Sequence, residues 1–425
     1  MTQHGRGPDT IYAFKHALVQ EAAYEILPKS RRVRLHHQIA TALELLADES
    51  KDIRPETLAH HFFLAEEYYK ACEHWWRAAI EARQNSADTE AVAFIHAALD
   101  ANSRLPESNA SRDREIELRE DLYVPLQVTS WGSPEIAQNV ERLRELRMQR
   151  GDREELLDIL HALSGYNIIS GRISAARKLA EEILDQYGQK DEVARVLGLR
   201  AMGMCSFLSG EPDEAIAEFK QIISLCDHID LNRMRQFYQA DTALIAHCMI
   251  CWALALKGER EDMTAALAAV EPMIEACSDR WSSAYSLIVL ASTHQTAGNV
   301  DQCLEFVYRG IPIAEECRSD YWIGWGEVLR GWAVARKGHV SQGSSEITQG
   351  LDRYCATGSK QMIPYAKTLL ADALLASGQT VEVLEIIDEL TFNREPEEVR
   401  FVDSMLKKLS RRAKARKKKD NARKA

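Results

Sequence analysis

The sequence predicts an all-α protein, a superhelix of stacked antiparallel helical hairpins (an α-solenoid). Three observations predict it. Short turns containing Gly recur at spacings of 39, 48, 40, 40 and 40 residues. Apolar residues flank each turn at helical spacing, and alternation typical of strands is nearly absent. The turn glycines are Gly171, Gly210, Gly258, Gly298, Gly338 and Gly378.

The region before the first turn is predicted to be helical as well. Apolar periodicity runs through 56–82 and 89–105. Breaks are expected in SNASRDRE, residues 108–115, and in VTSWGSPE, residues 128–135. Pro134 should open the next helix, because its missing N–H costs nothing in the first turn, and Ser133 should be the N-cap.

The chain is predicted to have four parts. Residues 1–45 form a helical opening segment, 46–150 a helical N-terminal part of the array, 151–392 the repeats, and 393–425 a terminal helix with a basic disordered tail. Residues 1–10 and the tail after about Ser410 are expected to be disordered. The hairpins should stack into a right-handed superhelix.

The repeat unit shows itself best around Gly338. Trp322, Trp325, Leu329 and Trp332 stand at i, i+3, i+7 and i+10, one face of a helix before the turn. Small residues recur at fixed offsets from the turns, which would let the two helices of a hairpin approach closely. Seven residues before a turn stand Gly203, Ala291, Gly331 and Ala371, and five after stand Ala176, Ala215, Cys303 and Gly343.

This arrangement resembles a tetratricopeptide array, whose usual period is about 34 residues. A period of 40 implies longer helices or wider loops. The units around Gly258 and Gly378 depart from the pattern, because Met263 and Val383 occupy the small position after the turn.

Three stretches carry a more specific resemblance. They are YAFKHALVQEAAYEILPKSRRVRLHHQIATALE from Tyr12, LAHHFFLAEEYYKACEHWWRAA from Leu58, and YWIGWGEVLRGWAVARKG from Tyr321. In this order they resemble the C-terminal half of large bacterial signalling ATPases, which carry a class III adenylate cyclase domain, an AAA or STAND-type ATPase and a long tetratricopeptide region. The resemblance runs from Tyr12 to about Leu390.

The resemblance implies that the opening stretch closes a winged-helix segment behind an ATPase core. His16 resembles the sensor histidine of STAND ATPases, where an imidazole can hydrogen-bond a phosphate oxygen. The chain has no G-x-x-x-x-G-K-[ST] loop and no paired aspartates of a cyclase. We therefore expect no catalysis and no cofactor, and nucleotide contact by His16 only with an ATPase core in trans or upstream. A split, truncated or partial member of the family is expected.

Charge and composition limit the classes of binding partner that we expect. The net charge is −11, and the last nineteen residues hold eleven Lys/Arg and one Asp, which is +10, so the rest carries −21. An acidic body favours basic proteins or peptides and disfavours specific nucleic-acid binding. The tail is interpreted as a solvated end, with non-specific binding to nucleic acid or anionic lipid as the alternative.

Two further features bear on location. No run of eighteen apolar residues appears, so no membrane span is expected, and the first ten residues lack the apolar core of a secretory signal. The nine Cys have no framework spacing and are predicted to be reduced thiols of a cytoplasmic protein.

Candidate binding residues fall in two groups. The stripe Trp322, Trp325 and Trp332 could line a peptide groove, although packing between helices is the stronger interpretation. The patch Arg31, Arg32 and Arg34 could meet a phosphate, although a salt-bridged surface is the stronger interpretation.

Metal and nucleophile signals are weak. Cys248 and Cys251 form CMIC beside His247, but a single C-x-x-C in an apolar helix predicts core thiols rather than zinc ligands. The pairs His36–His37 and His60–His61 are interpreted as interface or surface residues. No local geometry selects a nucleophile and base.

The function predicted is a non-catalytic interaction and regulatory module that binds a protein, peptide or signal ligand on a concave face built from the first helix of each hairpin. It would gate an ATPase or cyclase partner in signal transduction. Two alternatives stay open: part of an adenylate cyclase enzyme with nucleotide-dependent regulation, and the regulatory part of a STAND-type transcription activator. The oligomeric state is open.

Overall fold

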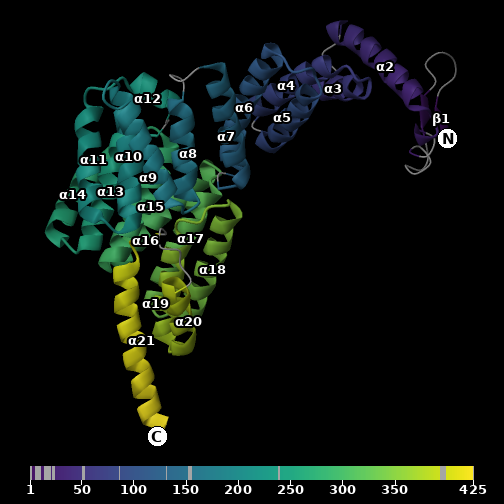
Figure 1. The fold of residues 1–425 in the computed structure, drawn as a ribbon. Coiled ribbons are helices and arrows are strands. Elements are labelled where there is room, and N and C mark those ends of the chain that lie inside the picture. Colours follow the sequence, from purple (N-terminus) through teal and green to yellow (C-terminus); the bar gives the residue numbers. More distant parts are fainter. Residues whose placement is uncertain are drawn as a thin grey trace. The chain divides into compact units, whose positions relative to one another are not determined.

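The computed structural model describes residues 2–4, 11–13, 21, 24–49, 53–85, 87–130, 132–151, 156–237, 240–392 and 399–424. The predicted fold class is confirmed: the described chain is built from antiparallel helices joined by short turns (Figure 1). It divides into two compact units, Met1–Thr129 and Ser130–Ala425, which are treated separately below as unit 1 and unit 2.

Unit 1 begins with a two-stranded antiparallel ribbon, β1 (Thr2–His4) with β2 (Ile11–Ala13), in which Gln3 pairs with Tyr12. Its helices are α2 (Lys29–Glu49), α3 (Pro55–Leu64), α4 (Tyr68–Gln84), α5 (Asp88–Ser103) and α6 (Asn109–Ser130). The strands differ from the expectation of a disordered start and a helical opening segment. The break expected at 108–115 falls before Asn109, so most of that stretch belongs to α6.

Unit 2 opens with α7 (Pro134–Arg150), where Pro134 and Ser133 take the predicted first-turn and N-cap positions. Six hairpins follow in its described residues: α8 (Leu157–Ile169) with α9 (Ile173–Gln186), α10 (Glu192–Ser209) with α11 (Pro212–Cys226), α13 (Thr242–Lys257) with α14 (Arg260–Ala276), α15 (Arg280–Ala297) with α16 (Val300–Glu316), α17 (Asp320–Arg336) with α18 (Val340–Ala356), and α19 (Ile363–Ser377) with α20 (Thr380–Phe392). A short helix, α12 (Leu231–Phe237), lies between the second and third hairpins, and α21 (Asp403–Lys424) ends the unit.

The turn glycines lie where the sequence predicts them. All six have φ between +78° and +104°, a left-handed conformation that only Gly adopts at no steric cost. The long spacing of 48 residues spans α12, so the insertion of this short helix accounts for the departure from 40. Met263 and Val383 are buried and do not prevent their hairpins from forming.

Two pairs of glycines bring α17 and α18 into backbone contact. A Cβ added to Gly343 would lie 2.3 Å from the carbonyl oxygen of Gly331, and one added to Gly324 would lie 2.7 Å from the carbonyl oxygen of Gly350. These distances are shorter than any real Cβ contact. The small residues at fixed offsets are therefore required in this hairpin.

The first helices of two hairpins do not present an open concave face. In α15 every residue from Ser282 to Gln295 is buried, and in α13 every residue from Leu244 to Ala255 except His247. A helix with one solvent-facing side cannot bury an unbroken run of that length. At α13 and α15 the helices therefore lack the solvent-facing inner side that the expected concave binding surface needs.

Loop contacts also bring the two ends of the array together. The N–H groups of Lys360 and Gln361 donate to the carbonyl of Ile169 at 2.8 and 3.1 Å, although almost two hundred residues separate them. Gly132 donates its N–H to Thr357 at 3.0 Å, and a Cβ on Gly132 would collide with the backbone of Gly358. The loop after α18 thus meets the start of α7 and the end of α8.

The structure also corrects the prediction for the basic tail. Residues 403–424 are helical, where disorder was expected after Ser410. Leu406, Leu409 and Ala413 lie on one face at spacings of three and four residues and are buried in the core of unit 2. That narrow apolar stripe within a strongly basic segment is sufficient to dock the helix.

Candidate interaction site

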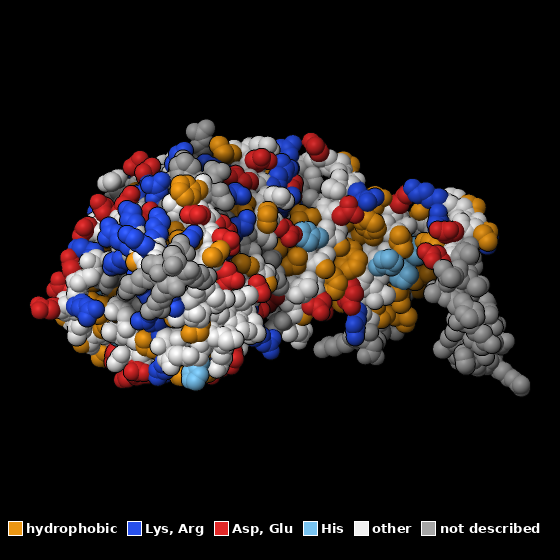
Figure 2. Space-filling view, turned by 90° about the horizontal axis from the view of Figure 1, so that it is seen from below, with side chains coloured by type: hydrophobic (Ala, Val, Ile, Leu, Met, Phe, Trp, Pro, Cys, Tyr) orange, Lys and Arg blue, Asp and Glu red, His pale blue; other side chains and the backbone are white. Residues whose placement is uncertain are grey.

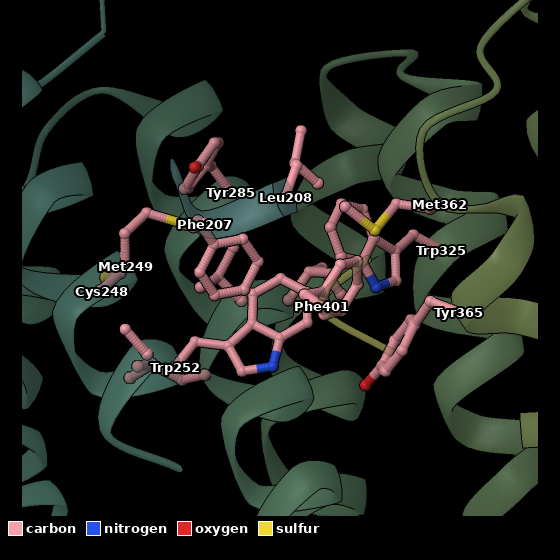
Figure 3. Packing of buried hydrophobic residues seen from close by; sticks show 14 of the residues in the cluster. Phe207, Leu208, Cys248, Met249, Trp252, Tyr285, Trp325, Met362, Tyr365 and Phe401 are labelled. Atoms are coloured by element: carbon pink, nitrogen blue, oxygen red, sulfur yellow. The ribbon is translucent and has the colours of Figure 1, made fainter. Parts of the chain in front are cut away.

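An aromatic cluster fills the middle of unit 2. Trp252 of α13 lies with its ring centroid 5.6 Å from Trp325 of α17, 5.5 Å from Tyr365 of α19 and 4.8 Å from Phe207 of α10. Figure 3 shows these side chains converging from helices that are far apart in the sequence. The cluster, named here the interior cluster, comprises Phe207, Trp252, Trp325, Tyr365 and Phe401.

Phe401 enters this cluster from outside the hairpins, just before α21. Its ring lies 5.2 Å from Phe207, 5.5 Å from Trp252 in an edge-to-face arrangement, and 5.6 Å from Tyr365 (Figure 3). Only 4% of Phe401 is exposed. Burying such a ring stabilises by roughly 1.5–3 kcal/mol, with a further ~0.5–1.5 kcal/mol for each well-oriented aromatic pair.

The backbone around Phe401 is held as well. The N–H groups of Arg400 and Phe401 both donate to the carbonyl of Leu208, at 2.6 and 3.1 Å. This carbonyl belongs to the last turn of α10, where the helix itself supplies no donor. Gly210 lies against the Arg400 carbonyl, since an added Cβ would be 3.3 Å from that oxygen. Residues 399–402 therefore supply hydrogen-bond donors that the last turn of α10 lacks.

Polar contacts fix α21 beside α19. Arg412 donates to Asp372 Oδ1 at 2.7 Å, and Arg416 donates to the carbonyl of Leu375 at 2.6 Å, near the C-terminus of α19. A guanidinium at that end meets both an orphan carbonyl and the negative end of the helix dipole. Asp372 also accepts from Trp332 Nε1 at 3.1 Å.

Polar groups of the interior link the hairpins across the unit. Tyr365 donates its hydroxyl to Gln295 Oε1 at 2.6 Å, and Trp252 Nε1 donates to Thr296 at 2.9 Å. Burial holds the pKa of the Tyr365 phenol well above its ordinary value, so it stays a donor. Trp325 Nε1 is buried without an acceptor among the described residues.

A cavity of about 10 Å³ lies beside the interior cluster, bounded by Trp325, Tyr354, Met362 and Tyr365 among others. Small-molecule sites in proteins occupy about 300–1,000 Å³. This cavity is therefore too small to hold a ligand of that kind.

The predicted tryptophan stripe is thus part of the core. Trp322, Trp325 and Trp332 are between 3% and 4% exposed. Trp322 stacks on Trp325 at 5.5 Å, and Trp332 is tied to Asp372. The stronger interpretation, packing between helices, describes these positions, and none of the three lines an open groove.

The predicted arginine patch lies on α2 in unit 1. Arg31 and Arg34 are exposed, and Arg32 is half-buried with its guanidinium 5.1 Å above the Tyr24 ring. Such a cation–π contact at a partly exposed site is worth about 0.5–1 kcal/mol. The same helix exposes Leu35, Ile39, Leu45 and Leu46.

The cysteines of CMIC are buried among apolar side chains. Burial raises the pKa of the Cys251 thiol to about 12, and that of Cys248 also rises well above its ordinary value. Within the described ranges no three His, Cys, Asp or Glu side chains come together as a metal site.

The structure brings together one histidine from each of the two pairs that the sequence analysis interpreted as interface or surface residues. His36 of α2 and His61 of α3 approach with their Nδ1 atoms 2.9 Å apart, and His36 Nε2 is 2.9 Å from the Tyr24 hydroxyl. His36 is buried, and burial lowers the pKa of both imidazoles. No sequence signal predicts this pairing, because the two residues lie on different helices.

His16 lies outside the described residues, so its predicted nucleotide role stays a prediction. Among the described helices, none combines the length and apolar character that crossing a bilayer requires.

Comparison with known proteins supports the fold and leaves the family unassigned. No family model matches the chain. An uncharacterised protein of Rhizobium meliloti (strain 1021) is 21% identical over 383 residues, which are 89% of this chain and 37% of that protein. The chain thus spans little more than a third of the length of this relative.

Among solved structures, a Rap protein complexed with competence and sporulation factor matches with a TM-score of 0.50 and 9% identity, over 83% of this chain and 98% of that one. The P58(IPK) TPR domain matches over 90% and 98% with a TM-score of 0.25 and 14% identity. The likeness to the Rap protein and the helical hairpins of the structure together show a tetratricopeptide-like helical-repeat fold.

Proposed function

We propose that this chain is the non-catalytic interaction and regulatory region of a bacterial signalling ATPase or adenylate cyclase, and that it binds a protein or peptide. The observation that carries the proposal is the interior of unit 2, where α10, α13 and α19 hold the short segment of residues 399–402 by ring contacts and backbone hydrogen bonds. Helical repeats of this kind use an extended inner surface to bind partners. Here residues 399–402 of the chain itself occupy that surface.

Two further observations support the signalling context. The opening stretch from Tyr12 and the helical stretch from Leu58 resemble those that follow an ATPase core, and the relative from Rhizobium meliloti is much longer than this chain. The Rap protein of similar fold is complexed with competence and sporulation factor, which is consistent with a signal ligand. The acidic body of −21 favours a partner with basic groups.

The test is the mass of the native protein in its source cells, measured with an antibody raised to this chain. We expect a band well above 48.0 kDa, with peptides that contain a phosphate-binding loop in the same band by mass spectrometry. A separate ATPase or cyclase that co-elutes with a 48.0 kDa band would support the partner arrangement instead. A band at 48.0 kDa that elutes alone would overturn the signalling context.

A further inference from the structure

The segment that precedes and begins α21 has the features of a bound helical ligand. Phe401 is its aromatic anchor in the interior cluster, and Val402, Leu406, Leu409 and Ala413 follow at spacings of four, three and four residues. Helices that bind in grooves present anchors at this spacing. Asp403 donates its N–H to the Arg400 carbonyl at 2.9 Å, so a tight turn leads from the anchor into the helix.

The opposite side of α21 is basic and solvent-exposed. Figure 2 looks at the side of the molecule on which α21 ends, and Lys and Arg side chains gather there. Its exposed cations include Lys407, Lys408, Arg411, Arg412, Lys414, Lys417 and Lys418. The contacts on this side are partly exposed ion pairs such as Arg412 with Asp372, and pairs of that kind stabilise little.

The docking of this segment combines a buried apolar stripe along α21, formed by Leu406, Leu409 and Ala413, with specific contacts at its start and middle. Phe401 and the two N–H bonds to Leu208 fix the start, and Arg416 fixes the middle through the Leu375 carbonyl. Each of these contacts is made to the hairpins by a segment that no hairpin includes. The helix pairs of the hairpins and their six turn glycines all lie outside this segment.

We propose that residues 399–416 occupy a peptide site in cis, and that the partner is a basic amphipathic helix with an aromatic residue at its first turn, which displaces them. This rests on the proposed function and names the class of its ligand. The partner's aromatic ring would take the place of Phe401 between Phe207, Trp252 and Tyr365. Its cation would meet Asp372, and its first N–H groups the Leu208 carbonyl.

The test uses a fluorescent synthetic peptide of residues 399–418 and the full chain. While the segment occupies the site in cis, the apparent affinity for an added peptide is reduced in proportion to the fraction of chains whose site is open. We therefore expect the Phe401→Ala chain to bind the peptide at least about tenfold more tightly than the wild-type chain by fluorescence anisotropy. A peptide with the same Phe401→Ala change should bind neither chain. The matched control is Phe392→Ala, an exposed phenylalanine of α20, which should behave as wild type.

A second variant covers the case in which Phe401→Ala does not fold. Arg412→Ala with Arg416→Ala loosens α21 from outside the core and should also strengthen peptide binding. Circular dichroism checks that the helix content is kept. Equal binding by wild-type and loosened chains, or no binding by any, would overturn the proposal. Neither outcome bears on the native mass, so failure here is distinguishable from failure of the proposed function.

Discussion

Trp332 and Arg412 share one carboxylate. The indole Nε1 of Trp332 donates to Asp372 Oδ2 at 3.1 Å, while Arg412 donates to Oδ1 at 2.7 Å. The carboxylate therefore joins α17, α19 and α21, the helices labelled in Figure 1.

We expect Asp372→Ala to lower the free energy of unfolding by about 1–3 kcal/mol, because the buried Trp332 N–H loses its acceptor. Asp372→Asn keeps an acceptor and should lose less. Urea unfolding followed by tryptophan fluorescence measures both. Asp388→Ala on the exposed side of α20 is the control and should stay within about 0.5 kcal/mol of wild type. Equal losses for the alanine and asparagine variants would contradict the role of this hydrogen bond.

Gly343→Ala should destabilise unit 2 by about 1–3 kcal/mol, because the new Cβ would lie 2.3 Å from the Gly331 carbonyl oxygen and force α17 and α18 apart. Gly165→Ala in α8 is the matched control, since its Cβ would meet nothing within 4 Å. Alanine is the better helix former by about 0.5–1 kcal/mol, so this control should stabilise. Thermal unfolding distinguishes the two, and a stabilising Gly343→Ala would refute the close approach.

The thiols should react in the order of their exposure. Cys355 is exposed, and a thiol reagent at pH 8 should label it first. Cys248 and Cys251 should react only after unfolding, because burial limits access and disfavours the thiolate. Labelling followed by mass spectrometry gives the order, with Cys355→Ser as the control. If a chelator accelerated labelling of Cys248 and Cys251, a bound metal would replace burial as the cause of protection.

Acidification should weaken unit 1 through His36 and His61. Burial lowers the pKa of both below the ordinary value of 6.5, and His60 and Arg32 lower that of His36 further. Below pH 6.5 the unfolded chain takes up protons that the folded pair resists. The pair's contribution is therefore fully present above pH 6.5 and falls as the pH drops toward the folded pKa values.

The measurement is the unfolding midpoint between pH 7.5 and 5 for wild type and His36→Gln. The variant should lose less stability on acidification. Other buried histidines act in the same direction in both chains, so the difference between the two isolates the pair. Identical pH profiles would show that the His36–His61 contact does not control the acid response.

Much of the fold could be predicted from local pattern. The six turn glycines, the start of α7 at Pro134 and the close glycine contact of α17 with α18 all follow from spacing, because turn chemistry and helix periodicity are properties of neighbouring residues. The prediction of a disordered tail was wrong, because it was based on the high positive charge and not on the narrow apolar stripe at Leu406, Leu409 and Ala413.

The candidate site could not be predicted in the same way. The sequence pattern is the same for a binding groove and for a packed helix interface, since each needs apolar residues at helical spacing. It therefore does not tell which of the two contains Trp252, Trp325 and Tyr365. Phe401 lies nearly two hundred residues from its Leu208 partner. No feature of the sequence around either residue indicates that the two are in contact.

The sequence by itself determined an all-α repeat with a period near 40 residues and the positions of the six hairpin turns of unit 2. Tertiary structure alone decided that α13 and α15 lack a solvent-facing inner side, that Phe401 closes the interior, and that His36 meets His61. The physical reason is that helix formation depends on residues three and four apart. Closure of the array depends on how the helices pack over the whole unit, where small differences at each hairpin accumulate.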